Sequence, residues 1–505
     1  MGYDTSLTPE LRDEVNRIRG YAIESGLEFF DVMFEVVDHD ELNEIAAYGG
    51  FPTRYTHWSH GMSYDQLAKG YDFGLSKIFE LVINNDPCYA YLMRSNEMVA
   101  QKLVIAHVYG HADFFRNNAC FARTNRKMMD EIANHATKVR RYIDKYGIDE
   151  VEKFIDACLS IEDLIDPFLP FAGTDYLKKR KYDPRRDRTD VEGETIEPTR
   201  FATDKEYMDR YINPPEKLAE ERARLREARE KEVGRFPERD EKDVLLFLIE
   251  HAPLRSWQRD VLQMLRAESC YFAPQRQTKI MNEGWASYWH STLMSQRICT
   301  AAEIVDYAAL HSSVMGGNGL NPYRLGLELY RDIEDRWNRG RHGKDWDECD
   351  DRETRERWDT REMAGRAKIF EVRKTKSDVT FIDEFLTQEF CERNRLFVYE
   401  YNEQTDHYVI TSREFNAVKR KLLFQLTNFG QPFIYVRDAN YQNRGELLLW
   451  HKHMGVDVRQ DYASETLANV QRIWDRPVHL ATTLEGEPHV FSHDGTQMRE
   501  RAGEP

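Results

Sequence analysis

The chain of 505 residues is longer than one ordinary domain, and 41% of its residues are hydrophobic, which is enough for a substantial core. Its formal net charge of −17 at pH 7 argues against general binding to nucleic acid or anionic membranes, since both need a basic surface. The sequence has no apolar signal segment and no run of about 18 apolar residues, so no membrane insertion is expected. Seven scattered cysteines without a C-x-x-C pair favour a reduced, cytoplasmic location.

The N-terminal part of the chain predicts a mainly helical region. Residues 8–50 are predicted to be helical, and residues 49–65, rich in Gly, Pro, Tyr and Trp, to form a structured loop. Further helices are predicted at residues 65–85, 94–116, 125–146 and 148–165. Residues 178–243 are strongly charged and predict an insertion, with an exposed helix in its second half. Helical periodicity then returns and continues to about residue 390.

Beyond residue 390 short β-like runs alternate with amphipathic helical stretches. Such a mixture is typical of a small α+β domain. We therefore predict two domains: a mostly helical domain at 1–390, with the charged insertion near 178–243, and a smaller α+β domain at 391–505.

A pair of histidines in the predicted helix at 94–116 suggests a metal site. His107 and His111 are four residues apart, so they lie on one face of a helix and can point at one ion. Their apolar flanks indicate burial, and neutral imidazoles suit zinc and other transition metals. Gly110 costs the helix about 1 kcal/mol, which suggests close approach by another group. Val108, however, stands where a zinc protease of the H-E-x-x-H type has its catalytic glutamate.

A second stretch, MNEGWASYWH, supplies further ligand candidates. Glu283 and His290 are seven residues apart and share a helical face. Together with His107 and His111 they offer up to four ligands to a divalent metal ion, with zinc preferred. The alternative to a metal site is that Glu283 and His290 form a hydrogen-bonded pair in the core without an ion.

The spacing leaves the role of Glu283 open. If the protein is a hydrolase, Glu283 can act as the catalytic base that position 108 lacks, and His290 is then the third ligand. Alternatively Glu283 is a ligand, and another histidine, such as His57 or His311, handles protons. Other chemistries are not indicated, because the chain has no Walker-type phosphate loop, no G-x-S-x-G turn and no paired Glu-x-x-His motifs for a di-iron site.

Four stretches of this sequence resemble one known family. They are AHVYGHADFFRNN, WQRDVLQMLR, YFAPQRQTKIMNEGWASYWH and GLNPYRLGLELYRDIE. They resemble the stage V sporulation protein R (SpoVR-like) family, and the likeness extends over most of the chain. The family's histidine and glutamate motifs fall on His107, His111, Glu283 and His290. The resemblance implies a role in sporulation, through spore cortex formation, or in stress response. It also implies a PrkA-type serine kinase and a YhbH/YeaH-like protein as partners.

Two functional hypotheses follow. The leading one is a cytoplasmic metal-dependent hydrolase of amide or peptide bonds that uses His107, His111 and either Glu283 or His290 around one divalent ion. The second is a non-catalytic regulatory or scaffold factor that works with the kinase and its companion protein. The missing glutamate at position 108 supports the second hypothesis.

Overall fold

The computed structural model describes residues 7–72, 80–172, 209, 213–232, 235–316, 320–402 and 406–505. The first half of the predicted insertion near 178–243 lies outside the described residues. The exposed helix predicted in its second half is confirmed as α9 (Pro215–Glu232). None of the described helices is both long and apolar enough to cross a membrane.

The chain forms two compact units. The first contains residues 1–152 and 267–431, and the second contains residues 153–266 and 432–505. The helices α6 (Ile148–Leu159) and α11 (Ser256–Gln277) each continue across a boundary between the two. The domain boundary at 390/391 stays a prediction.

The first unit contains a small three-stranded sheet. Its order is β1 (Val32–Val37), β3 (Cys88–Met93) and β2 (Leu81–Ile83), with β1 parallel and β2 antiparallel to β3. The predicted continuous helix over 8–50 is therefore wrong, because β1 separates α1 (Pro9–Glu24) from α2 (His39–Ala47). The segment VMFEVV is rich in valine, which favours strands. Asp38 then starts a new helix with a capping box to Glu41.

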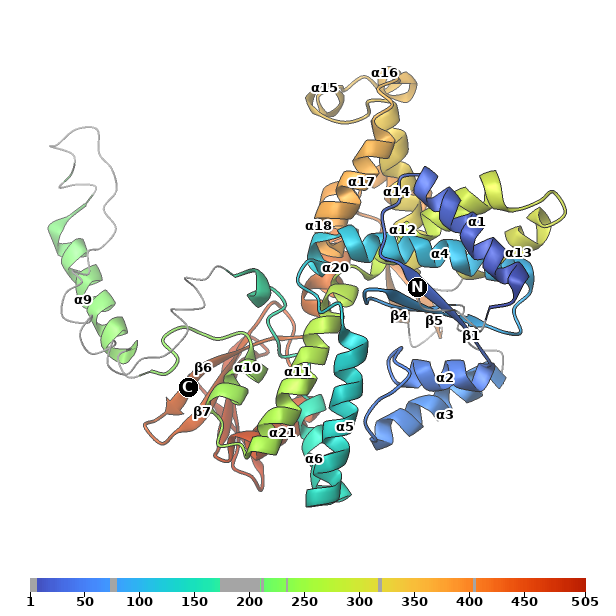
Figure 1. The fold of residues 1–505 in the computed structure, drawn as a ribbon. Helices are drawn as coiled ribbons and strands as arrows, with labels where there is room; N and C mark the ends of the chain where they lie inside the picture. Colours follow the sequence, from blue (N-terminus) through green and yellow to red (C-terminus); the bar gives the residue numbers. More distant parts are fainter. Residues whose placement is uncertain are drawn as a thin grey trace. The chain divides into compact units, whose positions relative to one another are not determined.

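Three helices form the centre of this unit: α4 (Met98–Asn117), α12 (Lys279–Leu293) and α14 (Pro322–Asn338) (Figure 1). A Cβ atom on Gly110 would lie 2.6 Å from Ala286 Cα, so α4 and α12 approach backbone to backbone. This is the close approach that the glycine in this helix predicted. A Cβ atom on Gly284 would lie 2.4 Å from Gly326 Cα, which brings α12 equally close to α14. Every residue of α4 from Val99 to Phe115 is buried, which is typical of a central helix.

The first unit contains several further elements. They are α3 (Trp58–Asp72), a 3-10 turn (Ala119–Phe121), α5 (Met128–Tyr146), a π-helical turn (Met294–Ile298), α13 (Ile304–Met315), α15 (Lys344–Asp347), α16 (Arg352–Arg357), α17 (Gly365–Thr375), α18 (Asp378–Phe385), α19 (Gln388–Arg393), β4 (Val398–Asn402), β5 (His407–Ser412), α20 (Phe415–Leu426) and a 3-10 turn (Thr427–Gly430). The helix α3 begins inside the loop predicted at 49–65. The strands β4 and β5 pair with each other in a separate two-stranded sheet.

The second unit is built on a five-stranded sheet. Its order is β10 (Met498–Ala502), β9 (Glu487–His493), β8 (Val478–Leu484), β7 (Glu446–Lys452) and β6 (Phe433–Tyr441). Only β7 and β8 pair in parallel, and α21 (Gln460–Trp474) provides the crossover between them. A 3-10 turn (Leu169–Phe171) and α10 (Val244–His251) also belong to this unit. The predicted fold class, a mainly helical N-terminal region with smaller α+β structure after it, is confirmed.

Candidate metal centre

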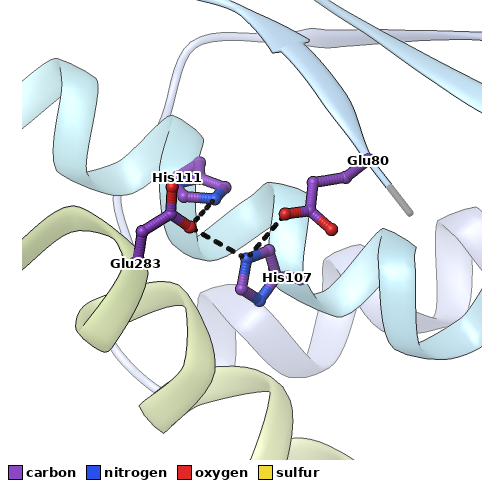
Figure 2. Close-up of side chains that lie close together, drawn as sticks. All are labelled: Glu80, His107, His111 and Glu283. Atoms are coloured by element: carbon purple, nitrogen blue, oxygen red, sulfur yellow. Dashed lines mark ion pairs between the residues drawn. The ribbon is translucent and has the colours of Figure 1, made fainter. Parts of the chain in front are cut away.

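Four side chains of the first unit converge on one point: Glu80, His107, His111 and Glu283 (Figure 2). Each offers one ligand atom, and these atoms all lie within 4.8 Å of one another. The two histidines come from successive turns of α4, Glu283 comes from α12, and Glu80 directly precedes β2. The structure thus brings together three of the predicted site residues and adds Glu80, which the sequence did not indicate.

The distances within the cluster fit a shared ion. Oε2 of Glu283 lies 3.4 Å from Nε2 of His111 and 3.7 Å from Nε2 of His107. Two ligands that are each about 2.1 Å from a tetrahedral zinc ion lie about 3.4 Å apart. Nε2 of His107 and Oε2 of Glu283 are buried and have no hydrogen-bond partner among the described residues. Buried polar atoms are rarely left unpaired, so this donor set fits a bound cation.

The electrostatics of the cluster also favour a cation. Burial raises the pKa of the Glu283 carboxyl, but its contacts with His107, His111 and Lys279 outweigh burial and hold the pKa well below its usual range. Burial lowers the pKa of His111, but the Glu283 carboxylate outweighs it and raises the pKa overall. The carboxylate is only 7% exposed, and its Oε1 pairs with Nζ of Lys279 over 3.3 Å. A divalent ion between the imidazoles would supply the positive charge that faces its other oxygen, Oε2.

The far side of each histidine is held by another side chain. Nδ1–H of His111 donates to Oδ1 of Asn282 over 2.9 Å, which leaves the Nε2 lone pair facing the cluster. Nδ1 of His107 lies 2.8 Å from Nδ1 of His290. Hydrogen bonds of this kind orient metal-binding imidazoles and fix their tautomer.

His290 occupies the opposite side of His107 from the two carboxylates. Its Nδ1 faces His107 and its Nε2 lies 3.0 Å from Nδ1 of His311. Both of its ring nitrogens are therefore used, and the described residues contain no hydrogen bond or ion pair between His290 and Glu283. Burial lowers the pKa of His290 well below its usual range, so the ring is neutral. The structure places His290 behind a ligand candidate.

Glu80 approaches the cluster from the side of His107. Its Oε1 lies 3.6 Å from Nε2 of His107, and the described side chains include no ion pair between it and His111. The hydroxyl of Tyr323 donates to the same Oε1 over 3.2 Å, and its ring stacks on His107 with centroids 6.0 Å apart. Tyr323 is the second residue of α14, so all three central helices reach this site.

The helices that carry the site are tied together beside it. Oδ2 of Asp113, on α4, accepts a hydrogen bond of 2.8 Å from Nε1 of Trp285, on α12. Oδ1 of Asp113 accepts the backbone N–H of Glu28, also over 2.8 Å. Burial raises the pKa of Asp113 to about 6.

His57, a predicted proton carrier, is hydrogen-bonded to Ser59 and is not one of the four converging side chains.

Comparisons with known proteins agree with the motifs. A family model described as SpoVR like protein matches residues 6–431, a range that includes all four converging side chains. A protein of Escherichia coli (strain K12), named uncharacterized protein YcgB, is 28% identical over 494 residues, which cover 90% of this chain and 88% of that protein. No solved structure matches the chain.

Proposed function

The chain belongs to the SpoVR-like family, and on this premise we propose that it is a metal-dependent hydrolase of amide or peptide bonds. One observation carries the proposal. Nε2 of His107, Nε2 of His111 and Oε2 of Glu283 lie close enough together in a buried site to bind one ion. A second carboxylate, that of Glu80, lies beside them. Two histidines and a glutamate form a ligand set that catalytic zinc sites use, with the fourth position open to water.

In this proposal Glu283 is a ligand and Glu80 is the catalytic base. The carboxylate of Glu80 accepts the proton of the attacking water, the role that Val108 cannot perform. The hydroxyl of Tyr323 orients Glu80 by its hydrogen bond to Oε1. A zinc ion, when bound, would lower the pKa of a water molecule and polarise the substrate carbonyl. His290 positions His107 from behind and is not itself a ligand.

The test is metal analysis of the purified protein combined with an assay on a library of short peptides. We expect one zinc ion per chain, loss of that ion in His107→Ala and His111→Ala, and peptide hydrolysis that stops when a chelator removes the metal. His135→Ala is the matched control, since His135 is also a buried helical histidine but pairs with Glu268 outside the cluster. Protein without stoichiometric metal, or with the same metal content after His107→Ala, would overturn the proposal.

A second candidate function is a non-catalytic regulatory role alongside a PrkA-type serine kinase and a YhbH/YeaH-like protein. The observation that favours it is the presence of four converging ligand atoms, because a site with four protein ligands is closed to substrate. In that case the ion would link α4, α12 and the segment before β2. Pull-down of the two partners by the wild-type protein, with no peptide hydrolysis and with metal loss in Glu80→Gln, would support this role over the hydrolase.

A further inference from the structure

A cavity of about 990 Å³ lies in the first unit, between the N-terminus of α14, the end of α19, the β4–β5 hairpin and α20. This volume is at the upper end of the range of small-molecule sites, roughly 300–1,000 Å³. None of the four metal-centre residues lines it. The cavity is therefore a separate feature that the proposed hydrolysis does not use.

The floor of the cavity is apolar. Leu325, Phe390, Val418 and Leu422 line it, and all four are buried. These side chains come from α14, α19 and α20, so the floor belongs to the packed core and is preformed. Such a surface suits an acyl chain or an aromatic group.

The rim of the cavity is cationic. Of the seventeen lining residues four are Arg or Lys and none is Asp or Glu, although acidic residues outnumber basic ones 88 to 71 in the whole chain. Arg393 is paired with Asp332, and Nζ of Lys421 donates to the carbonyl oxygen of Tyr399. The guanidinium groups of Arg324 and Arg395 have no carboxylate partner among the described residues.

The helix dipole does not stabilise the positive charge of Arg324. It is the third residue of α14, and a cation in the first turn of a helix meets the positive end of the helix dipole. Local stability therefore does not account for an arginine there. An anionic group bound at the rim would be favoured both by Arg324 and by the helix end.

From the apolar floor and the unpaired arginines, we propose that this cavity binds an amphipathic organic anion, with an acyl or aromatic body and a phosphate or carboxylate head. The body lies on Leu422 and on the half-buried Leu396, which also lines the cavity, and the head accepts hydrogen bonds from Arg324 and Arg395. Guanidinium groups bind both kinds of head in a two-pronged geometry, so the shared chemistry is the anion on an apolar body.

The test is calorimetric titration of the full chain with four probes. Dodecyl phosphate and dodecanoate carry the two possible heads, dodecyl maltoside carries the same chain with a neutral head, and inorganic phosphate carries no chain. We expect saturable one-to-one binding of at least one anionic amphiphile, and the tighter of the two identifies the head. We expect the neutral amphiphile and inorganic phosphate to bind at least about tenfold more weakly.

Two variants test whether the ligand binds in the cavity. The double variant Arg324→Gln, Arg395→Gln removes the two unpaired charges at exposed positions, so folding should be unaffected, and we expect about a tenfold loss of affinity. Arg352→Gln is the matched control, because Arg352 is an exposed helical arginine that pairs with Glu356 and does not line the cavity. Equal binding of the neutral amphiphile, equal affinity of the double variant, or no saturable binding of either anionic probe would each overturn the proposal.

Discussion

Nδ1 of His107 lies 2.8 Å from Nδ1 of His290, and both imidazoles are almost completely buried. A neutral imidazole has one donor and one acceptor nitrogen. For His107 to present a bare Nε2 to an ion, its Nδ1 must carry the proton and donate it to His290. His290 must then donate from Nε2 to Nδ1 of His311, 3.0 Å away. The three rings thus form a hydrogen-bond chain whose direction is coupled to metal binding.

We predict that His290→Phe weakens zinc binding by about 10- to 100-fold, because His107 loses the acceptor that fixes its tautomer. His290→Gln should restore most of the affinity, since its amide oxygen can accept the same hydrogen bond. The affinity is measured by competition with a chelator of known strength. The control is His135→Gln, which changes a buried histidine outside the site. If the Phe and Gln variants bound zinc equally, the positioning role of His290 would be wrong.

The proposed base gives a second prediction. Glu80→Gln should keep the zinc content of the wild type and lower peptide hydrolysis by about 100-fold or more, since the amide cannot accept the proton of water. Metal analysis and the peptide assay are made on the same sample. Glu97→Gln, an exposed carboxylate at the start of α4, should change neither quantity. Loss of zinc from Glu80→Gln would instead indicate that Glu80 is a fourth ligand and that the site has no open position for water.

Part of this site was predictable from the sequence, because helix geometry is local. The four-residue spacing of His107 and His111 places them on one face, and Gly110 indicated the close helix contact that brings Glu283 to them. The same geometry explains the place of His290. Seven residues along a helix span about 10.5 Å, so Glu283 and His290 cannot both lie beside the same side of His107.

Glu80 could not be predicted, because its place depends on a tertiary contact. It is a single glutamate before the short strand β2, and only the pairing of β2 with β3 brings it to α4. The strand β1 was missed for a related reason. It lies between two helices, and its extended conformation is stabilised by pairing with β3, which is distant in the sequence. The α+β character of the C-terminal part was visible because its strands and helices carry clear periodicity of their own.

The contact between α12 and α14 leads to a third prediction. Gly284→Ala should lower the free energy of unfolding by about 1–3 kcal/mol or more, because the new methyl group would overlap the backbone of Gly326. The measurement is chemical denaturation of metal-free protein. Gly20→Ala is the matched control in α1, where an added Cβ atom meets nothing within 4 Å. That substitution should stabilise the protein by up to about 1 kcal/mol. A stabilising effect of both changes would contradict the close helix contact.

Asp378 leads to a prediction about pH. It is 1% exposed, and its carboxylate accepts the backbone N–H groups of Ile280 and Met281 at the start of α12. Burial raises its pKa to about 7, despite these hydrogen bonds. Because the folded-state pKa lies above the ordinary value of 3.8, the contribution to stability is fully present below about pH 4 and is lost as the pH rises to about 7.

We therefore expect the contribution of Asp378, measured as the free energy of unfolding of metal-free wild type minus that of Asp378→Asn, to fall by on the order of a few kcal/mol between about pH 4 and about pH 8. The variant isolates this contribution, since an amide does not ionise yet can still accept a hydrogen bond from α12. The control is Asp351→Asn at the exposed N-cap of α16, where hydrogen bonds from Thr354 lower the pKa of the carboxyl, so its effect has the opposite sign. Denaturation curves at several pH values test the prediction, and parallel profiles for wild type and Asp378→Asn would contradict it.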